Sequence, residues 1–161
     1  MITLGSVNIV PADKVSLGDL VFGLGEDLSP ALCLKAPNQQ GDYDKVLAYP
    51  TKDKCPIHDM ECMTADFVSI GGWQIEVDYT QATKLDYLQD KFGSLVIAKD
   101  ALLLVCERLD GRGGYSVLKF LDTANSSVKY SQYAFPSWKI VKKEGDKEIV
   151  LLDRTRAIKS Q

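Results

Sequence analysis

Residues 18–25 read GDLVFGLG, and residues 93–100 read GSLVIAKD. After each stretch comes an apolar run with a cysteine, then a Gly and a Tyr before Val-Leu, then a tryptophan before an Ile. The two tryptophans of the chain, Trp73 and Trp138, fall at equivalent places in this order. Similar features in the same order are typical of an internal repeat, so the sequence predicts one structural unit used twice. The alternative is that the two halves share only the common strand-and-turn patterns of β proteins.

Both halves contain short stretches with the pattern of β-strands. Leu20, Phe22 and Leu24 alternate with smaller or permissive residues, which is the period of a half-buried strand. Further strands are expected at 31–36, 45–50, 67–70, 73–79, 93–98, 101–109, 115–122, 129–135 and 138–143. The stretch 142–153 predicts a hairpin that turns at Gly145–Asp146, with its last strand over Glu148–Asp153.

One stretch between the two halves has the spacing of a helix instead. Residues 78–93 read DYTQATKLDYLQDKFG and place apolar side chains on one helical face at Ala82, Leu85, Leu88 and Phe92. Thr80 or Thr83 can cap the start of this helix, and Gly93 suits its C-terminal end. The spacing predicts a helix over most of 83–92 that joins the two units.

About five short strands with small turns in each unit suit a small barrel or a twisted sheet closed on itself. The stretch KVSLGDLVFG at 14–23 resembles the opening strand of SH3-like small barrels. The predicted fold is all-β with one connecting helix, made of two tandem small SH3-like β-barrels that arise from an internal duplication. The predicted divisions are residues 1–79 for the first barrel unit, 80–92 for the connecting helix and 93–161 for the second barrel unit.

The composition is that of an ordinary globular protein, with 161 residues, 45% hydrophobic and 25% charged. The net charge of −3 is uneven, because residues 1–85 hold 6 Lys/Arg against 12 Asp/Glu and residues 86–161 hold 13 against 10. Either the halves attract each other, or the second half meets an anionic partner.

Cys33 and Cys106 lie in apolar runs, where we expect buried thiols. No secretory signal or membrane-spanning run is recognised, so a cytoplasmic location and no membrane partner are expected.

The stretch CPIHDMEC at 55–62 brings Cys55, His58 and Cys62 within the reach of one loop. Zinc prefers such sulfur and imidazole ligands, but structural zinc sites usually take all four ligands from Cys and His. The alternative is a polar surface loop with free cysteines, and no cofactor is expected.

His58 is the only histidine, and nothing beside the cysteines resembles a nucleophile elbow. The sequence therefore predicts no catalytic residue and favours a protein that is not an enzyme.

A mixture of aromatic and basic residues marks the last third of the chain. Its candidate ligand-binding residues are Tyr130, Tyr133, Trp138, Lys139 and Lys142, and further basic residues including Arg154 follow. Aromatic rings between basic groups can stack on nucleobases and neutralise phosphates. The alternative, which strand alternation favours, is that the aromatic rings are in the core and the lysines lie at the surface.

The function expected from these patterns is that of a non-enzymatic binding or assembly module. It would recognise a protein or a small ligand through barrel loops and grooves. The second hypothesis is a nucleic-acid-binding protein that uses residues 129–159 of the second unit. The third is a small zinc or Cys/His protein centred on His58. Binding that weakens steeply with salt favours the second hypothesis, and stoichiometric zinc favours the third.

Overall fold

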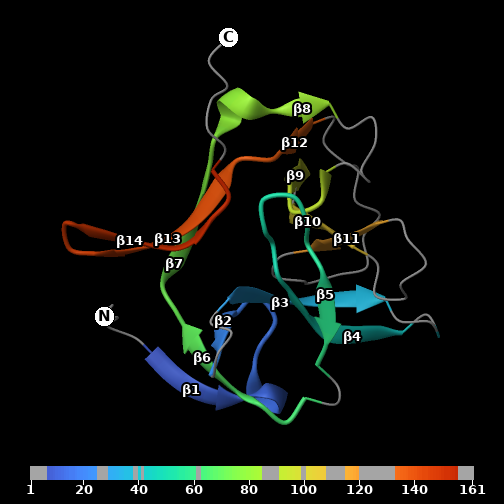
Figure 1. Cartoon of the computed structure of the whole chain (residues 1–161), viewed down its shortest axis with the longest axis vertical. Coiled ribbons are helices and arrows are strands. Elements are labelled where there is room, and N and C mark those ends of the chain that lie inside the picture. The colour runs from blue at the N-terminus through green and yellow to red at the C-terminus, as the bar shows by residue number, and fades with distance from the viewer. Residues whose placement is uncertain are drawn as a thin grey trace.

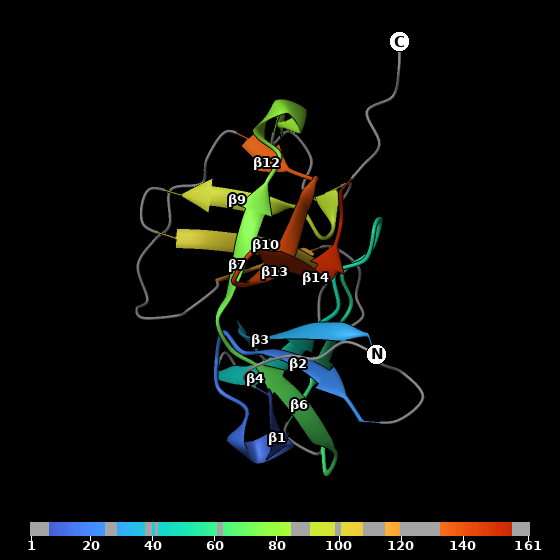
Figure 2. The same cartoon turned by 90° about the vertical axis from the view of Figure 1, so that its left-hand side faces the viewer.

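A computed structural model of the chain describes residues 7–24, 29–37, 40, 42–60, 63–84, 91–98, 101–107, 115–119 and 133–155. In these residues the fold is all-β, with three antiparallel sheets and no helix of seven or more residues (Figure 1). The first sheet lies at one end of the molecule and the second at the other, and β7 (Trp73–Val77) runs from one end toward the other (Figures 1 and 2).

The first sheet has six strands in the order β1-β6-β2-β3-β4-β5. The strands are β1 (Val7–Pro11), β2 (Leu20–Gly23), β3 (Pro30–Pro37), β4 (Tyr43–Ala48), β5 (Ile57–Asp59) and β6 (Asp66–Ile70). A single turn of 3-10 helix, η1 (Ala12–Lys14), follows β1.

The second sheet has five strands in the order β11-β10-β9-β12-β8. They are β8 (Thr83–Lys84), β9 (Leu95–Ala98), β10 (Ala101–Glu107), β11 (Tyr115–Lys119) and β12 (Tyr133–Phe135). The third sheet contains β7, β13 (Trp138–Glu144) and β14 (Lys147–Asp153), in the order β14-β13-β7. A second 3-10 turn, η2 (Tyr79–Gln81), links β7 to β8.

The two larger sheets repeat the same pairing pattern. Leu20 on β2 lies opposite Leu32 and Ile70, and Leu95 on β9 lies opposite Leu104 and Phe135. The edge strands β1 and β8 then pair with β6 and β12 at corresponding positions. Trp73 and Trp138 follow at the same distance in sequence after Ile70 and Phe135. The two tryptophans therefore occupy matching positions, as the sequence predicts.

The repeated glycines have the same backbone role in both sheets. Gly18 and Gly93 both have positive φ, at 86° and 77°. The Gly18 N–H donates to the Cys33 oxygen, and the Gly93 N–H donates to the Val105 oxygen, each at 2.7 Å. Cys33 thus corresponds to Val105 and not to Cys106. The thiols of Cys33 and Cys106 are both fully buried, as expected.

The third sheet joins the corresponding strands of the two halves. Ile75 on β7 lies opposite Ile140 on β13, Trp73 lies opposite Lys142, and Val77 lies opposite Trp138. This register is symmetric about the Ile75–Ile140 pair. Equivalent strands therefore pair antiparallel around a local pseudo-two-fold axis, as two copies of one unit do in a two-fold dimer.

The main hydrophobic cluster connects all three sheets. Its buried residues include Leu20 and Leu32 from the first sheet, Leu104 from the second, and Trp138 and Ile140 from the third. A second cluster covers the opposite face of the first sheet, around Val15, Val21, Cys33, Leu47 and Phe67. Because the main cluster takes residues from both halves, neither half buries its core-facing surface alone.

Arg154, just after β14, is only 1% exposed and ties loops of both halves together. The guanidinium group donates hydrogen bonds to the carbonyl oxygens of Thr51, Lys52, Phe92, Gly93 and Pro136. All five N–H donors of the guanidinium are used in this way. The Trp138 indole N–H donates to the same Gly93 oxygen at 2.8 Å, and the guanidinium carbon lies 5.8 Å from the Trp138 ring centroid. A buried cation of this kind is tolerated because polar partners replace its water.

The expected closure into barrels needs correction. In the described residues, the hydrogen-bonded order leaves each sheet open at two edges. The reason is that β7 and β13, which directly follow β6 and β12, pair with each other instead of returning to their own sheets.

The expected connecting helix is wrong at both described ends. Thr83 and Lys84 form β8 and pair with β12, and Phe92 lies in a turn, while residues 85–90 lie outside the described residues. Asp78, not a threonine, caps the short η2 turn by accepting the Thr80 N–H at 3.0 Å. Pairing with β12 thus overrides the helical spacing of the sequence at Thr83. The hairpin that turns at residues 145–146 is confirmed.

We expect Gly93→Ala to destabilise the protein more than the matched change Gly145→Ala. Both glycines have positive φ, but a Cβ at Gly93 would lie 2.6 Å from Arg154 Cζ, whereas a Cβ at Gly145 meets nothing within 4 Å. The difference in unfolding free energy, measured by urea titration, should be about 1–3 kcal/mol, the usual cost of overpacking. Equal losses in the two variants would mean that Arg154 is not held against Gly93.

Candidate functional site

The described aromatic and basic candidates of the last third, which are Tyr133, Trp138, Lys139 and Lys142, do not lie together at one surface. Trp138 is fully buried, and Tyr133 on β12 is 44% exposed. Lys139 and Lys142 lie on β13, and Tyr130 is outside the described residues. The described positions therefore provide one exposed ring and no stacked series of rings.

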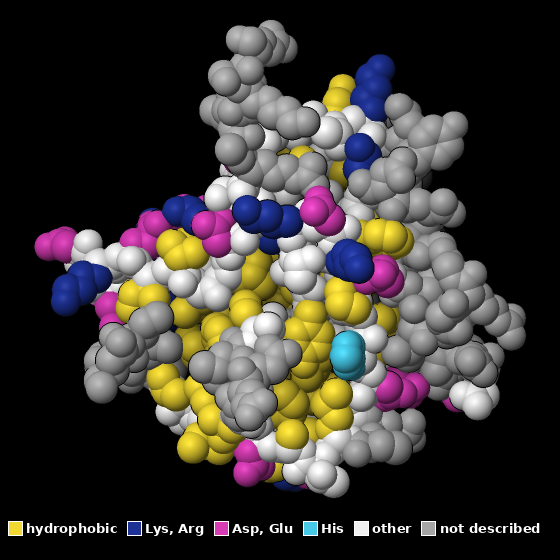
Figure 3. All heavy atoms as spheres, in the orientation of Figure 1, with side chains coloured by type: hydrophobic (Ala, Val, Ile, Leu, Met, Phe, Trp, Pro, Cys, Tyr) yellow, Lys and Arg dark blue, Asp and Glu magenta, His cyan; other side chains and the backbone are white. Residues whose placement is uncertain are grey.

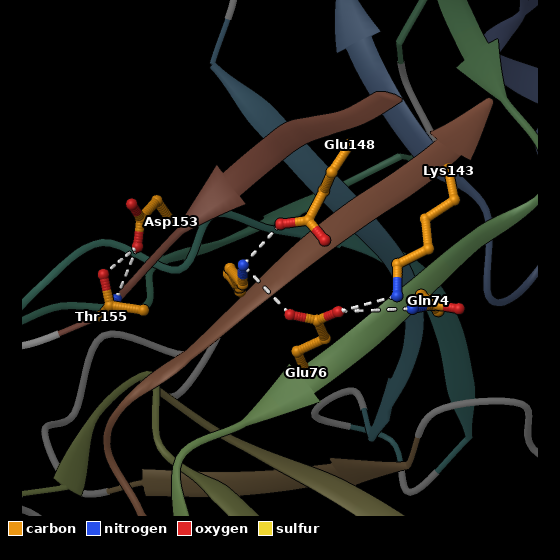
Figure 4. Close-up of polar contacts among 7 residues, drawn as sticks. Gln74, Glu76, Lys143, Glu148, Asp153 and Thr155 are labelled. Atoms are coloured by element: carbon orange, nitrogen blue, oxygen red, sulfur yellow. Dashed lines mark hydrogen bonds and ion pairs between the residues drawn. The ribbon is translucent and has the colours of Figure 1, made fainter. Parts of the chain in front are cut away.

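Lys139 lies in a network of charges on the third sheet, and Figure 4 labels its other members Glu76, Lys143 and Glu148. Its ammonium group is 2.7 Å from Glu148 and 3.0 Å from Glu76, and Lys143 approaches Glu76 at 3.4 Å. The hydrogen bond to Glu148 is the main cause that raises the pKa of Lys139, and the hydrogen bond from Lys139 lowers the pKa of Glu76. Glu76 comes from the acidic half of the chain and both lysines from the basic half. The opposite charges of the two halves thus meet within the molecule at this sheet.

Lys142 extends on the other face of β13 and is only 6% exposed. Its ammonium group is 3.6 Å from the Glu144 carboxylate. Little of this side chain is open to a phosphate group, so Lys142 acts as part of the packed sheet.

The residues of the predicted zinc site have unlike surroundings. Cys55 is fully buried, with its sulfur 3.5 Å from the Cys106 sulfur. His58 on β5 is exposed, and its ring meets the Tyr49 ring edge-on at 5.1 Å. No group of three metal-ligating side chains occurs in the part of the chain that the structure describes. Cys62 lies outside that part, so the three-residue site stays a prediction.

The strongest surface feature is one that the sequence pattern did not identify, the edge strand β1. Val7 is 43% exposed and Ile9 is 68% exposed. Val7 lies opposite Ile70, and Ile9 lies opposite Val68, so all four side chains share a face of the first sheet. This is the face that carries buried Leu20. This apolar face thus continues from the buried core to β1, where the side chains of Val7 and Ile9 are exposed.

Figure 3 shows hydrophobic side chains gathered over the half of the molecule that holds the first sheet, while charged side chains surround the β13–β14 hairpin. We refer to Val7, Ile9 and Val68 as the β1 edge surface.

Among the described strands, none pairs with the outer side of β1. The Ala12 N–H donates to the Ala65 oxygen at 3.1 Å, which fixes the alternation of the β1–β6 ladder. By this alternation the N–H groups of Val7 and Ile9 point away from β6. Pro11, the last residue of β1, has no N–H to leave unpaired on that side. No other described strand pairs with this edge.

The second sheet protects the corresponding edge. On β8, Lys84 lies opposite Tyr133 of β12. This is the position that Ile9 of β1 occupies opposite Val68 of β6. In addition, β8 has two residues, whereas β1 has five and carries no charge. Short length and lysine are common protections of edge strands against pairing with other chains. The β1 edge of the first sheet lacks both of these protections.

The chain belongs to a family described as "Uncharacterised protein y4lG", whose model matches residues 10–161. Searches of curated proteins and of solved structures gave no match. No helix in the described residues is long and apolar enough to cross a membrane.

Trp73→Phe leaves Trp138 as the only tryptophan and tests the buried placement of its ring. Because Trp138 is fully buried and its indole N–H is bonded, we expect iodide to quench the remaining fluorescence poorly. A single-stranded oligonucleotide should leave the emission unchanged. Strong quenching by the oligonucleotide would place Trp138 against nucleobases and support a nucleic-acid interface.

Proposed function

We propose that the chain is a non-enzymatic assembly module that pairs through β1 with the β1 strand of a second copy. The module consists of an internally duplicated β unit related to SH3-like small barrels, with β7 and β13 directed into a shared sheet. Five strands of the first sheet, in the order β1-β6-β2-β3-β4, match the order β8-β12-β9-β10-β11 of the second sheet, and this match and the shared registers support the duplication. The observation that carries the proposal is the β1 edge surface, which is apolar, carries no charge and has no described strand paired along its outer side.

The duplication supplies an internal comparison for this edge. If both units arose from one ancestor, β1 and β8 began as the same strand. The second unit now has Lys84 at its edge, and the first has Ile9 with 68% of its surface exposed. Placing isoleucine in water forgoes about 1.5–3 kcal/mol of burial free energy. We infer that β1 kept its apolar edge because another strand covers it.

An antiparallel pair of β1 strands satisfies the outward donors of both copies. With Ile9 opposite Ile9 of the second copy, each Ile9 N–H donates to the other Ile9 oxygen. Each Val7 N–H then donates to the Pro11 oxygen of the other copy, while the Val7 oxygen receives no bond in return because Pro11 has no N–H. The pairing is isologous, the commonest form of dimer contact. The β7–β13 pair is a precedent within the chain, because it joins equivalent strands around Ile75 and Ile140.

The nucleic-acid hypothesis receives less support from the described residues. Trp138 is buried, Lys139 is held between two carboxylates, and Lys142 is buried beside Glu144. Strand pairing through an uncharged edge, in contrast, should persist at high salt.

We expect the wild-type chain to self-associate weakly and Ile9→Lys, which copies the protection of β8, to abolish this association. A single strand pair buries less than the roughly 1,200 Å² of a stable interface, so sedimentation velocity should extend to about 1 mM protein. Val150→Lys is the matched control, because Val150 is also an exposed apolar residue on an edge strand, 45% exposed on β14. It should leave the association unchanged. A wild-type chain that stays monomeric over the whole range, or equal loss in both variants, contradicts the proposal.

A further inference from the structure

Two thiols from different sheets meet in the core. Cys55 precedes β5 in the first sheet, and Cys106 lies on β10 of the second. Their sulfurs are 3.5 Å apart, and both residues are fully buried. The Glu107 N–H donates to the Cys55 oxygen at 2.9 Å, so the two backbones are in direct contact beside the thiols.

We propose that Cys55 and Cys106 are a site of oxidative modification, where a disulfide forms and joins the first sheet covalently to the second. Hydrogen peroxide is the oxidant class that fits a buried site, because it is small. One thiolate attacks the peroxide, which gives a sulfenic acid and releases hydroxide. The other thiol then attacks that sulfur, an S–S bond forms, and water leaves. In the balance, two thiols and one peroxide give one disulfide and two waters.

The geometry favours this pair over the other described cysteine. A disulfide requires the sulfurs to approach to about 2.05 Å, a movement of roughly 1.5 Å that two side chains can share. Cys33 is also buried, but its sulfur lies 3.7 Å from the Met60 thioether, which cannot form a disulfide. Cys33 is therefore an internal control with equal burial and a different neighbour.

Burial makes the reaction slow in the folded protein. It raises the pKa of Cys106 well above its ordinary value, with the hydrogen bond to Cys55 adding to the effect, and burial raises the pKa of Cys33 to about 11. Neutral thiols react poorly with peroxide. The disulfide should thus form during brief local openings, and low concentrations of urea should accelerate it.

Once formed, the bond should stabilise the contact between the two halves. It links residues that are 51 positions apart, and a crosslink over a loop of that length restricts the unfolded chain. The shared core should then open less often, and the melting temperature should rise.

The test uses the full chain with Cys62→Ser, which removes the cysteine outside the described residues. After peroxide treatment in low urea and return to buffer, non-reducing peptide mapping should identify Cys55 joined to Cys106. The melting temperature should rise and should return to its first value with dithiothreitol. Adding Cys33→Ser should preserve the crosslink, and adding Cys106→Ser should abolish it.

Three results would overturn the proposal: thiols that stay reduced, oxidation to sulfinic acid without a crosslink, or a crosslink through Cys33. The peptide map of the Cys62→Ser chain decides among these even if Cys106→Ser fails to fold.

Discussion

The buried guanidinium of Arg154 is the interaction on which the arrangement of the two halves depends. Its five donors bind carbonyl oxygens from the loop at 51–52 in the first half and from residues 92, 93 and 136 in the second. A desolvated cation is costly unless its donors are satisfied, so these loops must stay in place together. Gly93 lacks a side chain at the point where the guanidinium lies against the backbone. Gly93 thus has the turn geometry that it shares with Gly18 and also lies at the joint between the two halves.

The way the units join also determines which edges are left open. Because β7 and β13 pair with each other, they no longer complete the sheets from which they come. The second sheet ends at a short strand with a lysine, while the first sheet ends at uncharged β1. Two sheets with corresponding strands therefore have unlike edges, and the proposed assembly uses only that of β1. The latent thiol pair lies in the same shared core, so oxidation would act on the joint and leave the edge accessible.

Much of the fold follows from local patterns in the sequence. The Gly18 and Gly93 stretches predict the repeat because both turns require positive φ just before a strand, and alternation locates most of the strands.

The pairing of β7 with β13 has no local signal, since it depends on which distant edge is free. Thr83 becomes strand through contact with β12 despite its helical spacing. Arg154 resembles a surface charge in sequence, because only the folded loops supply its carbonyl partners. The β1 edge was missed because a strand of five residues with mixed alternation is a weak pattern.

The central claim is that two corresponding units share one core and fold together. Differential scanning calorimetry of the full chain tests it most directly. A shared core predicts one transition whose calorimetric enthalpy equals the van't Hoff enthalpy, because neither half can keep its apolar surface buried after the other unfolds. Two separate transitions, each with the enthalpy of about half the chain, would contradict the claim and make the two halves independent domains.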